Sequence, residues 1–271
     1  WIAERILEMM ADGTVVIDTS GRRVGQVNGI AVLDLGDFAF GRPSRITART
    51  SLGHGSILSI ERETNLAGPI HNKGFLILSG YLAGQYAQER ALALAATLTF
   101  EQGYEGVEGD SASVAELAAL LSSLADTEVN QAIAVTGSVN QYGQVQAVGG
   151  VTQKIEGFFE VCCATELTGQ QGVIIPAANV PHLMLKHAVV QAIETGRFHV
   201  WADDADVSRI TDEAMALLTG VPAGARGPDG RFAEGSLHRR VEDKLSGYAD
   251  KARKPETWDR DRPRRMRRLR A

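Results

Sequence analysis

Residues 106–164 read GVEGDSASVAELAALLSSLADTEVNQAIAVTGSVNQYGQVQAVGGVTQKIEGFFEVCCA and contain two helical patterns with chemically useful residues at their starts. Ser111 stands directly before a long apolar helical pattern at 112–125. A second helical pattern follows a glycine pair, covers 151–164 and carries Lys154 in its first turn. A serine at one helix start and a lysine in the first turn of another are the groups from which a serine–lysine hydrolase is built.

The composition is that of an ordinary globular protein, with 271 residues, 44% hydrophobic and 23% charged. The longest apolar runs, such as 91–98, fall far short of the ~20 residues that a membrane-spanning helix needs, and no secretory signal pattern is visible. The two cysteines, Cys162 and Cys163, are adjacent, and no spaced cysteine–histidine cluster is present. We therefore expect a cytoplasmic protein with no structural zinc and no membrane contact.

Strands and helices alternate along the chain after a β-rich start. Short strands are expected between 14 and 60, an apolar strand at 75–78 and a helix over 81–98. Further strands are expected at 131–136, 172–176 and 197–201, a hairpin at 139–148, and further helices at 181–193 and 206–218. This order predicts an α+β (mixed α/β) fold.

The chain divides into three parts by pattern and charge. Residues 1–14 are expected to be the end of a helix that begins upstream, with a linker, and 15–220 form the main domain. Residues 1–220 hold 13 Lys+Arg and 25 Asp+Glu, whereas 221–271 hold 15 and 8. The last part is therefore predicted to be a basic, flexible tail with short helical patches. Nucleic acid is not expected to bind the acidic body; the tail is open to nucleic acid, an adaptor or another subunit.

Ser111 has a structural and a functional interpretation. Asp or Ser before an apolar helical run commonly caps the helix, and Ser113 with Glu116 fits a capping box. Alternatively, the polarised amides of the helix start hold the oxyanion of an acyl-transfer intermediate. The small side chain of Ala112 then leaves room for a substrate carbonyl.

Lys154 also has two interpretations. It lies beside the apolar stripe of its helix, and most such lysines extend to solvent. A lysine held in an apolar site instead has a depressed pKa and can act as a general base toward a serine. Thr136, at the end of the strand between the two helices, is placed to bind and orient the amine.

Other catalytic and nucleotide-binding motifs are absent from the sequence. There is no G-x-S-x-G nucleophile elbow and no H-E-x-x-H zinc motif. There is no G-x-x-x-x-G-K-[ST] either, so the chain cannot hold ATP by a P-loop. We therefore expect no metal and no cofactor in this chain.

Four motifs together resemble the proteolytic domain of Lon proteases. They are HNKG at 71–74, EGDSAS at 108–113, TGS at 136–138 and GGVTQK at 149–154. Ser111, Thr136 and Lys154 also have the family's spacing. The resemblance covers about 15–218 and implies a Ser–Lys dyad, with Ser111 as nucleophile, Lys154 as general base and Thr136 supporting the lysine. His71 belongs to the matching segment upstream of the serine.

The resemblance further implies a homo-hexameric ring that degrades unfolded or unfoldase-delivered polypeptides. In the family an AAA+ ATPase module precedes this domain, so ATP and Mg²⁺ are expected only for such a module and not for this chain. The EGD sequence before Ser111 resembles the LonB branch, in which acidic residues engage the lysine, and this implies a gating role for Glu108 and Asp110. Two alternatives remain open: a ring-forming module with an inactive dyad, and an ATP-independent peptidase.

Overall fold

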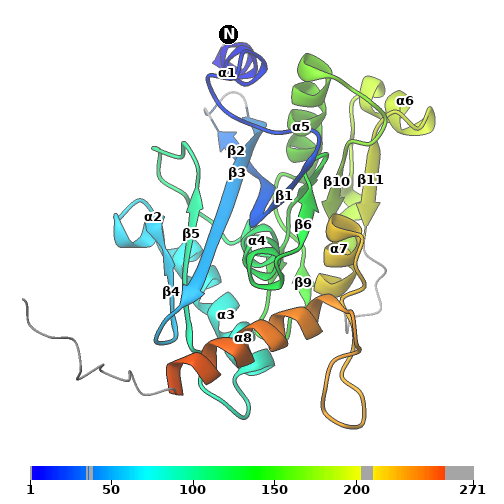
Figure 1. The fold of residues 1–271 in the computed structure, drawn as a ribbon. Coiled ribbons are helices and arrows are strands. Elements are labelled where there is room, and N and C mark those ends of the chain that lie inside the picture. The colour runs from blue at the N-terminus through cyan, green and yellow to red at the C-terminus, as the bar shows by residue number, and fades with distance from the viewer. Residues whose placement is uncertain (1, 35, 37–38, 203–209, 254–271) are drawn as a thin grey trace, which may run out of the picture.

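A mixed β-sheet forms the centre of the molecule (Figure 1). The structure is a computed structural model and describes residues 2–34, 36, 39–202 and 210–253. The strands of this sheet, in spatial order, are β11 (His199–Ala202), β10 (Gly172–Ile175), β7 (Ile133–Val135), β2 (Gln26–Asp34), β3 (Ala39–Leu52), β5 (Leu94–Phe100) and β4 (Ser56–Ser59). The strands β2, β3 and β5 pair antiparallel, and the remaining pairs are parallel.

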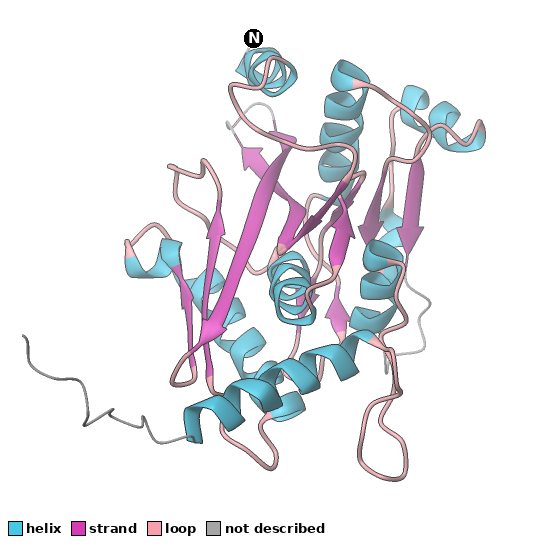
Figure 2. Cartoon of the chain, in the orientation of Figure 1, coloured by secondary structure: helices cyan, strands magenta, loops and turns pink. Residues whose placement is uncertain are grey.

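Helices cover both faces of the sheet. The helices are α1 (Ile2–Ala11), α2 (Ile60–Glu63), α3 (Pro69–Tyr86), α4 (Ser113–Ala125), α5 (Val151–Thr165), the 3₁₀ helix η1 (Ala177–His182), α6 (His187–Glu194), α7 (Ile210–Thr219) and α8 (Leu237–Arg253). Two small antiparallel ladders join β1 (Arg22–Val24) to β6 (Glu128–Asn130) and β8 (Ser138–Val139) to β9 (Val145–Gln146). Figure 2 shows these helices around the strands, and the α+β (mixed α/β) fold class is confirmed.

Alternate residues of the central strands enter two separate cores, because side chains on a strand point to opposite faces in turn. In β7, Ile133 and Val135 join the core that contains α4, and Ala134 joins the core that contains α5. In β10, Ile174 belongs to the first core, and Val173 and Ile175 to the second. The end of β7 therefore lies between the two helices on which the sequence placed Ser111 and Lys154.

The segment 75–98 differs from the sequence prediction. Phe75, Leu78 and Leu82 are buried, whereas Leu76 is 55% exposed. This is the one-sided burial of a helix, and α3 continues to Tyr86 instead of containing a strand at 75–78. The predicted helix over 81–98 is wrong after residue 86, because alternate residues of 94–100 are buried in strand β5.

The prediction of a flexible tail is wrong for 221–253. In α8 the residues Leu237, Val241, Leu245 and Ala249 recur every fourth position and are buried, so the helix packs on α4 through one narrow stripe. His238 is also buried and bonds both Tyr86 at the end of α3 and Asp212 in α7. The rest of the predicted tail, 254–271, lies outside the described residues.

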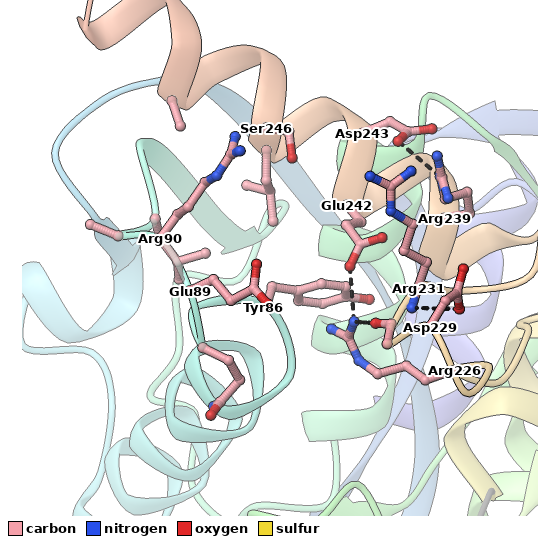
Figure 3. A pocket seen from close by; sticks show the side chains of 16 residues that line it. Tyr86, Glu89, Arg90, Arg226, Asp229, Arg231, Arg239, Glu242, Asp243 and Ser246 are labelled. Atoms are coloured by element: carbon pink, nitrogen blue, oxygen red, sulfur yellow. Dashed lines mark hydrogen bonds and ion pairs between the residues drawn. The ribbon is translucent and has the colours of Figure 1, made fainter.

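A cavity of about 580 Å³ lies between α8 and the loops at 88–92 and 226–231 (Figure 3). Four of the charged side chains that line it form two ion pairs. Arg226 contacts Glu242 at 3.0 Å, and Arg239 contacts Asp243 at 2.9 Å. The first pair joins the loop at 226–231 to α8, whereas the second lies within α8.

Within the described part of the chain, no helix has the length and apolar character that crossing a bilayer requires.

Candidate active site

Ser111, Thr136 and Lys154 form one hydrogen-bonded group. The Lys154 Nζ atom lies 2.8 Å from Ser111 Oγ and 2.9 Å from Thr136 Oγ1. Thr136 Oγ1 also donates to the Ser111 carbonyl oxygen at 3.1 Å. The three residues that the sequence singled out therefore meet in space, although nothing in their local patterns requires it.

Ser111 does not cap the helix that follows it. The N-cap residue of α4 is the half-buried Ala112, and no side chain caps this helix start. The capping box predicted for Ser113 and Glu116 is also wrong, because Ser113 Oγ accepts a hydrogen bond from the Val139 amide instead. The Ser111 hydroxyl therefore contacts Lys154 and does not cap α4.

The start of α4 is fixed to the end of β7 by backbone hydrogen bonds. The Gly137 amide donates to the Ser111 carbonyl at 2.9 Å, and the Val114 amide donates to the Gly137 carbonyl at 3.2 Å. Thr136 in turn donates its amide to the Ile174 carbonyl in β10. These bonds attach the serine to the central sheet, which explains how a loop residue has a defined position.

Lys154 is buried, with 2% of its surface exposed. Burial disfavours the charged amine and lowers its pKa to about 8, and the nearby charge of Asp110 acts in the opposite direction. The depth of the lysine follows from close packing of α5 on β3. A Cβ atom on Gly41 would lie 2.6 Å from Lys154 Cα, and one on Gly157 would lie 1.9 Å from the Gly41 oxygen. These two glycines could not be selected from the sequence, because their only local signal is the absence of a side chain.

The acidic residues before Ser111 have partners other than the lysine amine. Ser138 Oγ donates to Asp110 Oδ2 at 2.8 Å, and Asp110 acts on Lys154 through its charge. Glu108 Oε1 accepts a hydrogen bond from the Ile70 amide at 3.1 Å, at the start of α3. Ser138 is a member of this group that the sequence analysis did not choose, although it lies in the TGS motif.

His71 lies in α3 behind the serine loop. It is 1% exposed, packs edge-on against Phe100, and its Nε2 atom lies 3.6 Å from Glu116 Oε1 in α4. Burial lowers the pKa of His71 and raises that of Glu116 to about 8, so both side chains favour their neutral forms. His71 therefore packs between α4 and the loop that precedes Ser111.

Comparison with known proteins points to the family that the sequence motifs resemble. Residues 85–199 match the model of the Lon protease (S16) C-terminal proteolytic domain. The chain is 47% identical over 220 residues to a putative Lon protease homolog of Escherichia coli (strain K12), covering 80% of this chain and 37% of that protein. It is 39% identical over 242 residues to a putative Lon protease homolog of Haemophilus influenzae, covering 89% of this chain and 39% of that protein.

An archaeal Lon protease of Pyrococcus abyssi is 34% identical over 211 residues, covering 72% of this chain and 18% of that protein. The matched region is thus similar to a proteolytic domain. The chain belongs to the Lon (S16) family of proteolytic domains. It spans about two fifths of the length of the two bacterial relatives.

Proposed function

We propose that this domain is a serine endopeptidase in which Ser111 is the nucleophile and Lys154 the general base. The observation that supports this most directly is the 2.8 Å contact between Lys154 Nζ and Ser111 Oγ. It joins a hydroxyl to an amine whose pKa is lowered to about 8, so that a substantial fraction of the amine is neutral near physiological pH. A buried lysine of this kind activates a serine without a histidine.

The reaction begins when neutral Lys154 takes the Ser111 proton as Oγ attacks the carbonyl carbon of the peptide bond. The lysine then returns that proton to the leaving amine, the C–N bond breaks, and an ester on Ser111 remains. Water attacks the ester with the lysine again as base, which releases the carboxylic acid and restores the serine. The Ser111 and Ala112 amides, at the polarised start of α4, are the donors we propose for the oxyanion.

Thr136 orients the lysine in this scheme. Its hydroxyl proton is committed to the Ser111 carbonyl, so its oxygen presents a lone pair to Nζ. One amine N–H then points to Thr136, and the amine lone pair is free to face the Ser111 hydroxyl. This arrangement favours the proton transfer that the reaction needs.

We further propose that the domain acts on unfolded polypeptides delivered by an ATP-dependent unfoldase module, within a homo-hexamer. The greater length of the relatives supports this, because they contain much sequence that this chain does not match. ATP and Mg²⁺ would then belong to the other module, and polypeptides would be the partners of the present chain.

Hydrolysis of unfolded casein tests the proposal. The wild-type protein is expected to release peptides, and Ser111→Ala is expected to release none above background while keeping its melting temperature. Peptide release by Ser111→Ala at the wild-type rate would refute the assignment. A complete lack of activity and of serine labelling in the wild type would favour the ring-forming module with an inactive dyad.

A further inference from the structure

The loop that precedes Ser111 runs along the start of α3. The Val107 amide donates to the Leu66 carbonyl at 2.8 Å, and the Gly68 amide donates to the Val107 carbonyl at 2.9 Å. Ala67 and Val107 thereby form a short parallel bridge. The backbone is thus attached to the entry of α3 four residues before the nucleophile.

Glu108 supplies the cap that α3 lacks. The N-cap residue of this helix is Gly68, the next residue is Pro69, and the first turn contains no acidic side chain. The Glu108 carboxylate accepts the Ile70 amide at 3.1 Å, so an anion from another segment meets the positive end of the helix. A Cβ atom on Gly68 would lie 1.3 Å from Glu108 Oε2, and only glycine leaves room for the carboxylate.

The same helix contacts the next two residues of the loop. The Gly109 carbonyl accepts a hydrogen bond from the His71 ring and thereby favours the protonated form of that ring. One turn further on, a Cβ atom on Gly74 would lie 2.8 Å from Asp110 Cβ, so α3 and the loop are in direct contact there. Three consecutive residues before Ser111 therefore lie against one face of α3.

Helix α4 packs against the part of α3 that the loop contacts. Glu116, in the first turn of that helix, lies 3.6 Å from His71, and both side chains are almost fully buried. Glu61 from α2 and Glu108 also act on the His71 ring through their charges. The loop thus lies beside a buried contact between α3 and α4.

We propose that Glu108 is a positioning residue: by capping α3 it fixes the loop that presents Ser111 to Lys154. This role deepens the proposed function and rests on it, because a defined place for Ser111 Oγ matters only if it reacts. It also differs from a gate. A carboxylate that held the lysine inactive would suppress activity, whereas a carboxylate that positions the serine supports it.

Substitutions of Glu108 in the full chain distinguish the two roles. Glu108→Gln keeps an oxygen for the Ile70 amide and is expected to retain kcat for peptide hydrolysis within about threefold. Glu108→Ala loses the cap, and kcat is expected to fall about 10- to 100-fold with little change in KM, because small displacements of a nucleophile have effects of this size. All rates are measured well below the melting temperatures, so that a merely less stable variant would still show the wild-type kcat.

Two further variants on α3 serve as comparison. Gly74→Ala presses on Asp110 from α3 and raises intrinsic helix propensity, so a fall in its kcat cannot result from a weaker helix. Lys73→Ala changes an exposed side chain one residue earlier and is expected to behave like the wild type. Wild-type kcat in both Glu108→Ala and Gly74→Ala would overturn the proposal, and higher activity in Glu108→Ala would establish a gate instead.

Amide hydrogen exchange provides a readout that does not depend on activity. Protection of the peptide covering 106–113 is expected to fall in Glu108→Ala and to persist in Glu108→Gln. An inactive wild-type protein would refute the proposed peptidase function, but this exchange pattern would still support the attachment of the loop to α3. Equal protection in the wild type and both variants would overturn the attachment itself.

Discussion

Two buried groups of titratable side chains lie on opposite sides of the serine loop, and burial favours the neutral form in both. On one side Lys154 is 2% exposed and hydrogen-bonds to Ser111 and Thr136 at 2.8 and 2.9 Å. On the other, His71 and Glu116 are 1% and 2% exposed, and their nearest polar atoms are 3.6 Å apart. We propose that desolvation makes Lys154 a base toward the Ser111 hydroxyl, whereas His71 and Glu116 serve as structural support.

Removal of the lysine amine is expected to have the largest effect. Lys154→Met fills a similar volume without a base, and kcat/KM should fall by about 10²–10⁴-fold, the usual contribution of a positioned general base. Steady-state hydrolysis of a fluorogenic peptide measures this loss. A variant with more than half of the wild-type activity would show that Ser111 reacts without the lysine.

The pH dependence of hydrolysis tests whether Lys154 must be neutral to act as the base. The base must be neutral, so kcat/KM should rise with pH and level off above a midpoint of about 8. Two pH units below that midpoint the rate should be about 100-fold under the plateau. Asp110→Asn removes a charge that raises the lysine pKa, so its midpoint should move to lower pH. An unmoved midpoint would mean that another group limits the rate.

The orienting role of Thr136 predicts a smaller loss. Thr136→Val keeps the shape but removes the acceptor for Nζ, and kcat should fall about tenfold, the order of one or two kcal/mol for a hydrogen bond to a polar group. Thr136→Ser restores the hydroxyl and should recover most of the activity. Equal activity in the two variants would show that the 2.9 Å contact does not orient the base.

A change in the buried pair of His71 and Glu116 should alter the stability of the fold more than the rate of peptide hydrolysis. The pKa of Glu116 is raised from 4.5 to about 8 in the folded protein, so its contribution to stability is present below pH 4.5 and is lost as pH rises through 8. Glu116→Gln should remove this loss and raise the free energy of unfolding at pH 8 by about 1–4 kcal/mol relative to the wild type. Urea unfolding of the wild type and of Glu116→Gln at pH 5 and pH 8 measures this difference in the free energy of unfolding.

Glu63→Gln, an exposed change in α2, is the matched control for this experiment. It should leave the pH dependence of unfolding unchanged. A wild-type pH dependence in Glu116→Gln would mean that Glu116 is already ionised in the folded protein.

The three candidate residues could be selected from the sequence only together, through the spacing that joins their motifs, because each one alone also has a structural interpretation. Ser111 precedes a strongly apolar helix, and Lys154 follows a glycine pair. Their supporting contacts could not be predicted in this way. The contact of Glu108 with Ile70 and the packing of Gly41 on Lys154 join residues that are distant in the chain and leave no periodic signal.

The errors in the fold have a related cause. The run Phe75–Leu78 is as apolar as a buried strand, and only the surrounding spacing of buried residues identifies it as part of α3. In α8 the apolar stripe is so narrow that charged residues dominate the composition, which suggested a solvated tail. Tertiary packing decided both segments, whereas α4 and α5 were evident from local periodicity alone.

The rate at which a fluorophosphonate labels Ser111, followed by mass spectrometry between pH 6 and 10, tests the central claim most directly. We expect one adduct per chain, located on Ser111, with a rate that rises with pH around a midpoint of about 8. Lys154→Met should label at least about 100-fold more slowly. Labelling of Ser113 or Ser138 instead, or a rate on Ser111 that depends on neither pH nor Lys154, would contradict a Ser111–Lys154 dyad.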